Sequence, residues 1–226
     1  MKHHQLELLK NLLPVVPGML DKQELFCSAV LVLLASFDGE YHFIFEKRAS
    51  NVRQGGQICF PGGQIDSCVD ENSEAAAIRE TVEELGISRE KITVIGRLDT
   101  FIAPLGVSIE AFVGVAKINN LEELKIASSE VEYVFSVPVS HFVENEPQEY
   151  DTIVRVHPSY INEKGEEVVL FPARELGVGE MYTRPWGGRR LKMFIYNVNN
   201  EVIWGITARF INDVANKLKQ LPNNVI

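Results

Sequence analysis

Apolar residues in this chain are grouped in short runs that are typical of a buried sheet. Residues 28–37 are almost continuously apolar, as in a strand covered on both faces. Asp38-Gly39 follows as a hairpin turn signal, and residues 41–47 return as a second strand. Further strands are predicted at residues 92–101, 107–116, 130–138 and 191–197.

Both ends of the chain have a helical pattern. Leucines recur between residues 6 and 13, which predicts a short amphipathic helix, and we expect this helix to pack on its own domain. Residues 15–26 resemble a linker. At the other end, residues 202–210 begin a helix that is predicted to run to about residue 221, with Trp204 as a core anchor.

The length of 226 residues suits one large domain with extensions. We therefore assign residues 1–24 to the N-terminal helix and linker, and residues 25–226 to one domain. Residues 144–190 are interrupted by glycine and proline and contain two predicted strands, at 152–157 and 167–171. We interpret them as an insertion that folds onto the same domain.

A carboxylate-rich helix is predicted to begin near residue 72. Asp70, Asn72 and Ser73 are all good N-capping types, and the alanines that follow favour a helix. Gly86 is a plausible C-terminal stop. The helix therefore spans about four turns between these signals.

Three glutamates lie close together on this predicted helix. Glu80 is three and four residues from Glu83 and Glu84, and Arg79 is four residues from Glu83. Like charges repel at this spacing, and a hard divalent cation such as Mg²⁺ would remove the penalty. The ordinary alternative is a solvated acidic helix face. The Gly-Gly turn at 62–63 and the arginine within the cluster favour a metal site.

The segment before this helix is polar, basic and rich in glycine. Arg48 and Arg53 lie in it, and arginine offers bidentate hydrogen bonds to phosphate. Ordinary surface arginines are the alternative. A loop with two arginines that leads into a metal site is suited to phosphate contacts.

Composition narrows the class of protein. The chain has 22 basic and 31 acidic residues, a net charge of −9, which disfavours nucleic-acid binding. Cys27, Cys59 and Cys68 show neither zinc spacing nor a disulfide framework. The N-terminus lacks the apolar segment of a signal peptide, and residues 29–35 are too short to span a bilayer. We therefore expect a soluble cytoplasmic protein without a membrane partner.

Residues 79–87, RETVEELGI, resemble the second half of the Nudix box, G-x5-E-x7-R-E-U-x-E-E-x-G-U, in which U is apolar. Thr81 occupies an apolar position. Glu71 stands seven residues before Arg79, as the pattern asks, but Gly63 lies two residues earlier than its glycine. The turn is therefore longer than usual, and Asp70 is as good a candidate as Glu71 for the first acidic position.

A second stretch resembles one branch of this family, the coenzyme A diphosphatases. Residues 56–63, GQICFPGG, match the core of that branch's pattern, and residues 203–208 resemble its closing segment. Gln54 stands where histidine is usual and Ala49 where serine is usual. The insertion at 144–190 is also longer than expected for the branch.

The resemblance implies an α/β fold, the Nudix α/β/α sandwich with a mixed sheet. It implies Mg²⁺ or Mn²⁺ as the cofactor, held by glutamates of the helix and a further acidic residue near the strand at 130–138. Our candidate ligands are Glu80, Glu83, Glu84, the carbonyl of Gly63, and Glu130 with Glu132 in reserve.

The implied reaction is the hydrolysis of a diphosphate linkage. Metal and bound water supply the chemistry. Glu80 or Glu83 would be the base, and Arg79 would orient the carboxylates. The substrate-binding candidates are Arg48, Arg53, Gly56, Gln57 and Gly62.

Within the resemblance, the substrate is coenzyme A or an acyl derivative, which is split into 3′,5′-ADP and 4′-phosphopantetheine. Two rivals stay open: a diphosphatase for ADP-ribose or another nucleoside diphosphate derivative, and a catalytically silent nucleotide-binding module. The complete set of carboxylates disfavours the silent module. Nudix proteins are often dimers, so a homodimer is one expectation, but no stretch of the sequence identifies an interface.

Overall fold

The computed structural model describes residues 2–222, and its centre is a mixed sheet of eight strands. The main strand order is β3-β2-β1-β7-β5. The other three strands pair beside it: β4 with β1, β6 with β7 and β8 with β2. Only the β1–β7 pair is parallel within this sheet. The strands are β1 (Phe26–Phe37), β2 (Glu40–Arg48), β3 (Ile58–Cys59), β4 (Gly62–Gln64), β5 (Ile92–Arg97), β6 (Phe101–Ala103), β7 (Val107–Ala116) and β8 (Val131–Pro138).

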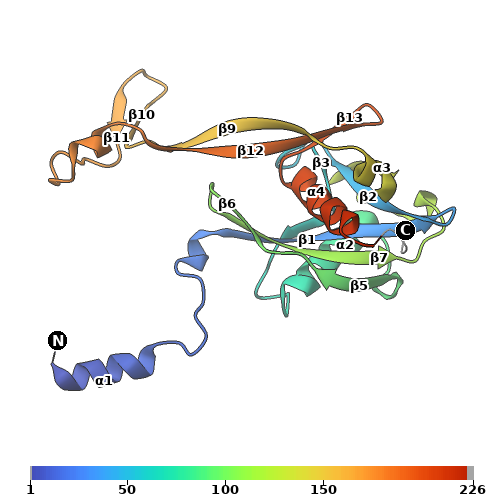
Figure 1. Ribbon diagram of the computed structural model, residues 1–226, viewed down its shortest axis with the longest axis horizontal. Coiled ribbons are helices and arrows are strands. Elements are labelled where there is room, and N and C mark those ends of the chain that lie inside the picture. Colours follow the sequence, from blue (N-terminus) through green and yellow to red (C-terminus); the bar gives the residue numbers. More distant parts are fainter. Residues whose placement is uncertain (1, 223–226) are drawn as a thin grey trace.

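Helices lie on both faces of this sheet (Figure 1). Helix α2 covers one face, while α3 and α4 cover the other. The helices are α1 (His3–Leu12), α2 (Ser73–Leu85), α3 (Val139–Glu144) and α4 (Gly205–Lys219), with short 3₁₀ turns at Lys22–Glu24, Arg89–Lys91, Leu121–Glu123 and Glu180–Thr183. This confirms the predicted α/β/α sandwich with a mixed sheet.

Strand β1 explains why its sequence is continuously apolar. Side chains alternate between the two faces of a strand. Leu31 and Leu33 pack under α2, whereas Val32 and Leu34 belong to the cluster under α4. Both sets are buried because each face carries a helix.

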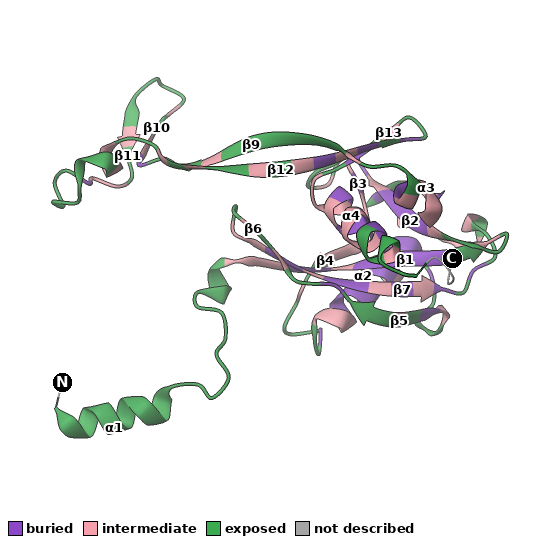
Figure 2. Ribbon diagram, viewed as in Figure 1, coloured by how far each residue is buried: buried purple, intermediate pink, exposed green. Residues whose placement is uncertain are grey.

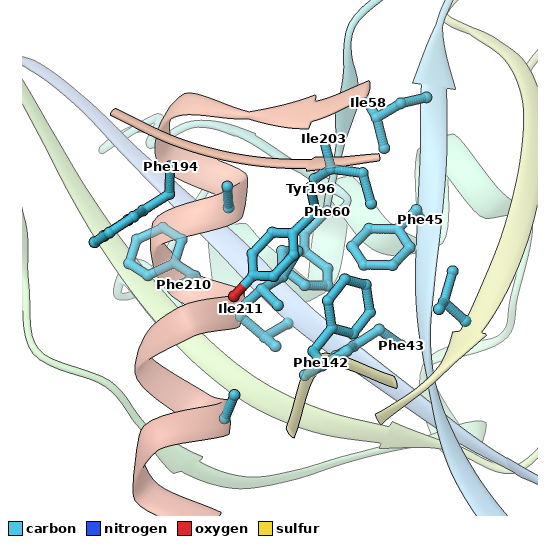
Figure 3. Packing of buried hydrophobic residues seen from close by; sticks show 14 of the residues in the cluster. Phe43, Phe45, Ile58, Phe60, Phe142, Phe194, Tyr196, Ile203, Phe210 and Ile211 are labelled. Carbon is cyan, nitrogen blue, oxygen red and sulfur yellow. The ribbon is translucent and has the colours of Figure 1, made fainter. Parts of the chain in front are cut away.

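The core under α4 is aromatic. Phe60 lies 4.9 Å from Phe45 and 5.7 Å from Phe43 between ring centroids, and Phe142 of α3 lies 5.6 Å from Phe43. Figure 3 shows these rings beside Ile211 of α4. Large aromatic side chains bury much apolar area, so this cluster fixes α3 and α4 on the sheet.

The remaining strands form a long arm and its base, and at the base Phe194, Tyr196, Val198 and Ile203 pack into the core under α4. These strands are β9 (Gln148–Val156), β10 (Ser159–Ile161), β11 (Glu167–Val169), β12 (Trp186–Val198) and β13 (Glu201–Trp204). Strands β9 and β12 run side by side away from the body and carry the β10–β11 hairpin at their far end (Figure 1). The expectation that residues 144–190 fold onto the domain is therefore wrong, because nearly all of β9 is exposed (Figure 2).

Three further expectations need correction. Helix α1 buries none of its residues, so it does not pack on its own domain (Figure 2). The strand predicted at 92–101 is divided into β5 and β6. Residues 201–204 form strand β13 before α4 begins, and the side chain buried there is Ile203, whereas Trp204 is 43% exposed.

Candidate metal and diphosphate site

Helix α2 begins and ends at the residues that carry its capping signals. The Asn72 side chain accepts a hydrogen bond from the Ala75 backbone N–H at 2.9 Å. Gly86 ends the helix in the left-handed conformation, with φ of 62°. Thr81, which departs from the family pattern, is buried and donates its hydroxyl to the Ala77 carbonyl at 2.7 Å, so the polar group is satisfied.

Arg79 is the centre of an acidic network on this helix. Its Nη1 lies 2.8 Å from Glu80 Oε1 and 3.0 Å from Glu83 Oε2. Its Nε and Nη2 donate to the two carboxylate oxygens of Asp70, at 2.9 and 3.0 Å. These hydrogen bonds raise the pKa of Arg79 and lower that of Asp70. Arg79 thus contacts three of these carboxylates, and its role in orienting them stays a prediction.

The geometry also distinguishes Asp70 from Glu71. Asp70 is buried and holds Arg79 in a bidentate pair, while it also accepts the Asp66 backbone N–H at 2.9 Å. Glu71 is exposed and makes no such bond among the described residues. Of the two candidates, Asp70 is therefore the one that pairs with Arg79.

The Gly62-Gly63 turn fits closely against α2. Gly62 donates its backbone N–H to Glu84 Oε2 at 2.9 Å, and a Cβ at Gly62 would lie 2.4 Å from the Ala29 carbonyl oxygen. A Cβ at Gly63 would lie 2.4 Å from the carboxyl carbon of Glu80. Only glycine leaves room for this approach, so the pair of glycines brings the turn onto two of the predicted metal ligands.

A buried carboxylate that the sequence analysis missed lies beside Glu84. Glu46 is 0% exposed, and its Oε1 accepts a hydrogen bond from the Cys59 thiol at 3.3 Å. Arg48 Nη1 lies 3.8 Å from Glu46 Oε1 and 3.7 Å from Glu84 Oε1. Burial is the main cause that raises the pKa values of Glu46, Glu84 and the Cys59 thiol.

The alternation of side chains along β2 could have identified Glu46 from the sequence. Ile44, two residues earlier in β2, packs on the α2 side of the sheet, so Glu46 faces the same side. Charged residues are almost never fully buried without a partner, and Glu46 Oε2 has no hydrogen-bond partner among the described residues. Glu46 Oε2 is thus a carboxylate oxygen still available as a metal ligand, and it lies next to the predicted metal ligands.

The two predicted phosphate-binding arginines differ in their surroundings. Arg48 points toward the buried carboxylates and donates Nε to the Arg53 carbonyl at 3.1 Å. Arg53 is exposed, and its guanidinium lies 4.9 Å from the centre of the Phe26 ring. Backbone bonds from Gly56 N to Arg48 O and from Arg48 N to Gln57 O close the loop, at 2.8 and 3.0 Å. Arg48 is linked to the Gly-Gly turn through Glu84, which both Arg48 and Gly62 contact, and the contact of all four residues with phosphate stays a prediction.

Glu130 lies immediately before β8 and is exposed. Its backbone carbonyl accepts the Ala49 N–H at 2.8 Å, which ties it to the basic loop. Burial is the main reason that the pKa values of Glu46 and Glu80 are raised, and the charge of Glu130 contributes to both. Glu130 therefore lies near enough to this group to stay the preferred candidate over Glu132.

The donor set suits a hard divalent cation. Glu80, Glu83, Glu84 and Glu46 supply carboxylate oxygens, which Mg²⁺ and Mn²⁺ prefer. Within residues 2–222, no three acidic, histidine or cysteine side chains are arranged to hold a metal as they stand. Arg79 and Arg48 contact these carboxylates instead. The orphaned Glu46 Oε2 and the close Gly63–Glu80 approach fit a cation that would compete with the two arginines.

Comparison with known proteins identifies the family of this chain. The family model described as "NUDIX domain" matches residues 25–166, more than half of the chain. The chain belongs to the Nudix family. Within residues 2–222, the structure contains no helix with the length and apolarity that crossing a membrane requires.

Three relatives show how far the similarity extends. Nudix hydrolase 3 of Caenorhabditis elegans is 32% identical over 51% of this chain and 48% of its own. The human mitochondrial coenzyme A diphosphatase NUDT8 is 32% identical over 57% of this chain and 55% of its own. A protein named uncharacterized Nudix hydrolase NudL, from Citrobacter koseri, is 32% identical over 79% and 76%. The chain thus spans about half the length of the two animal relatives.

Proposed function

We propose that this protein is a metal-dependent hydrolase of a diphosphate linkage in a nucleotide derivative. The observation that carries the proposal is the close fit of the Gly62-Gly63 turn against Glu80 and Glu84 on α2. This fit brings carboxylate oxygens of α2 and the backbone of the turn close together around one small space. That combination suits a cation with an anionic substrate.

The proposed metal ligands are Glu80, Glu83 and Glu84, with the Gly63 carbonyl and Glu130 completing the set. A bound Mg²⁺ or Mn²⁺ would neutralise the diphosphate and lower the pKa of a bound water. Arg79 and Asp70 hold the carboxylates in position. Glu80 or Glu83 accepts the proton from the attacking water, and Glu83 is the more accessible, with its side chain 56% exposed against 17% for Glu80.

We further propose coenzyme A or an acyl derivative as the substrate, with 3′,5′-ADP and 4′-phosphopantetheine as products. The GQICFPGG segment supports this, as does the similarity to a relative whose name is coenzyme A diphosphatase. Exposed Arg53 would contact the phosphates, with Gly56 and Gln57 beside it. Arg48 would contribute once the metal has taken over its carboxylate partners.

The test is product analysis on a panel of coenzyme A, an acyl-coenzyme A, ADP-ribose and a diadenosine polyphosphate, with Mg²⁺ or Mn²⁺. We expect turnover of the coenzyme A compounds and none in a chelator. Strong turnover of ADP-ribose without turnover of coenzyme A would refute the substrate assignment. No turnover of any compound, with nucleotide binding retained, would indicate a binding module.

The variant Glu83→Gln tests the role of the cluster. We expect turnover to fall roughly 100-fold or more, because metal catalysis contributes several kcal/mol to lowering the barrier. Glu90→Gln removes the same charge from an exposed position outside the cluster and is the matched control. Equal activity in both variants would exclude Glu83 from the site.

A further inference from the structure

Strand β9 has one unpaired edge. In the three-stranded sheet it lies at the end of the order β13-β12-β9, so only β12 pairs with it among the described residues. Its nine residues run along the arm away from the body (Figure 1). The other edge presents a row of backbone N–H and C=O groups to solvent, a ready template for a further strand.

The arm has one charged face and one largely apolar face. Glu149 and Asp151 pair across the ribbon with Lys192 and Arg190, at 2.6 and 3.3 Å. The alternate positions form the other face, where most cross-strand neighbours are apolar (Tyr150 with Met193, Thr152 with Leu191, and Val156 with Trp186) and one is charged, Val154 with Arg189.

This apolar face is poorly covered. Tyr150 is 56% exposed and Val156 is 51% exposed. A two-stranded ribbon is marginally stable in water unless another strand or helix packs against it. A long strand edge with an apolar face and no proline is one that proteins ordinarily pair or cover.

We propose that β9 pairs in antiparallel fashion with β9 of a second copy of this chain, around a two-fold axis at Thr152. The two arms then form one continuous sheet with β9 strands at its centre. Such an interface is isologous, as expected for a closed dimer.

About this point two of the four cross-strand pairs of β9 are complementary, and the other two, Asp151 with Ile153 and Gln148 with Val156, bring no like charges together. With Thr152 opposite itself, Glu149 lies opposite Arg155 of the second copy, and Tyr150 lies opposite Val154. Opposite charges and aromatic–β-branched pairs are the cross-strand pairs that stabilise sheets. Arg155 forms no ion pair within residues 2–222, so its charge is available to the second copy.

Neighbouring registers fit less well. A two-fold axis at Asp151 would bring the two Asp151 carboxylates together. An axis at Ile153 would leave Gln148 and Glu149 opposite residues beyond the end of β9. Thr152 is the midpoint of the strand, so this register alone pairs all nine residues.

The charge of the arm also favours a second copy of the chain over nucleic acid or a membrane as the partner of β9. Residues 148–190 carry seven acidic and six basic side chains, whereas the whole chain has a net charge of −9. A nearly neutral surface has no electrostatic attraction for nucleic acid or an anionic membrane. Two copies of it approach each other without strong repulsion.

Cysteine cross-linking tests both the partner and the register. Residues directly opposite in an antiparallel pair have Cα atoms about 4.5–5.5 Å apart, a distance that a disulfide can bridge. In a Cys68→Ser background, which removes the exposed native thiol, we expect Thr152→Cys to form a covalent dimer under mild oxidation with copper phenanthroline. Val156→Cys, on the same face, should stay uncross-linked, because the two Val156 positions would be about 27 Å apart.

Sedimentation analysis of the wild-type chain should show a dimer. Arg155→Glu sets like charges opposite each other twice in the dimer, so we expect its dimer Kd to rise roughly tenfold. Arg184→Glu makes the same charge change at an exposed site outside β9 and should leave the dimer Kd unchanged. A monomer at all concentrations would overturn the proposal. A dimer whose cross-linking is equal at Val156 and Thr152, or stronger at Ile153→Cys, would overturn this register.

Discussion

Helix α2 with its Gly-Gly turn and the β9–β12 arm are both strongly patterned in sequence, yet they have opposite environments. Helix α2 buries Ala76, Ala77 and Leu85 against the sheet, and the carboxylates of its polar face are held by hydrogen bonds from Arg79 and Gly62 and by an ion pair with Arg48. The arm exposes nearly all of β9. The difference teaches that a periodic pattern specifies an element, while packing from elsewhere in the chain decides whether that element is rigid and what it contacts.

Among the changes that test this comparison, Gly62→Ala should cause the largest loss of stability. The new Cβ would lie 2.4 Å from the Ala29 carbonyl oxygen, at a residue with φ of 154°. Overpacking and backbone strain together should lower the free energy of unfolding by about 3–5 kcal/mol. Urea denaturation measures this. Gly106→Ala, where φ is 76° and no atom lies within 4 Å, is the control and should cost only about 1–2 kcal/mol. Equal losses would show that the turn is not tightly packed on β1.

Next in size is Arg48→Met. Arg48 lies between buried Glu46 and Glu84 and its charge lowers the pKa values of both, so its removal breaks two ion pairs and leaves the carboxyl groups to bind protons instead. We expect a loss of about 2–4 kcal/mol in unfolding free energy, measured in a chelator. Arg53→Met removes an exposed guanidinium from the Phe26 ring and should cost about 0.5–1 kcal/mol. Similar small losses in both variants would leave Arg48 free for phosphate binding alone.

Asp70→Asn should have a smaller effect. The charged half of the bidentate pair with Arg79 is lost, which should cost roughly 1.5–3 kcal/mol and loosen the hold on Glu80 and Glu83. We therefore also expect weaker metal binding, measured by calorimetry with Mn²⁺. Glu71→Gln, at the exposed neighbouring position, should change neither property. The reverse result would return the role to Glu71.

The smallest effect should come from shortening the arm. Replacing residues 157–185 with Asn-Gly would join β9 to β12 directly, at the paired residues Val156 and Trp186. The body keeps its core, so we expect its unfolding free energy to change by less than about 1 kcal/mol and turnover to stay the same. Thermal denaturation and the product assay check this. A large loss of turnover would mean that the arm belongs to the site.

Much of the fold was predictable because its signals are local. The central hairpin follows from alternating and continuous apolar runs with an Asp-Gly turn, and α2 follows from Asn72, the alanines and Gly86. The same local signals placed Arg79 beside Glu83 on the helix; the structure confirms that contact and adds one between Arg79 and Glu80.

The errors arose where burial depends on distant segments. Trp204 is larger than Ile203, yet Ile203 packs into the core, because β13 pairs with β12 and turns that residue inward. The insertion was expected on the body because its strands were visible but their partners were not. Each strand of the arm pairs within the arm, which lets it project.

The sequence by itself determined the class of site: three glutamates and an arginine on one helix, with two glycines before it, because helix period and turn chemistry act over a few residues. Only the tertiary structure decided how these groups differ. Glu83 faces solvent, Glu84 is buried on Gly62, Asp70 replaces Glu71 as the partner of Arg79, and Glu46 joins from β2. Burial and pairing of this kind depend on which strands and turns meet in space, and residues far apart in the chain carry no local signal of that.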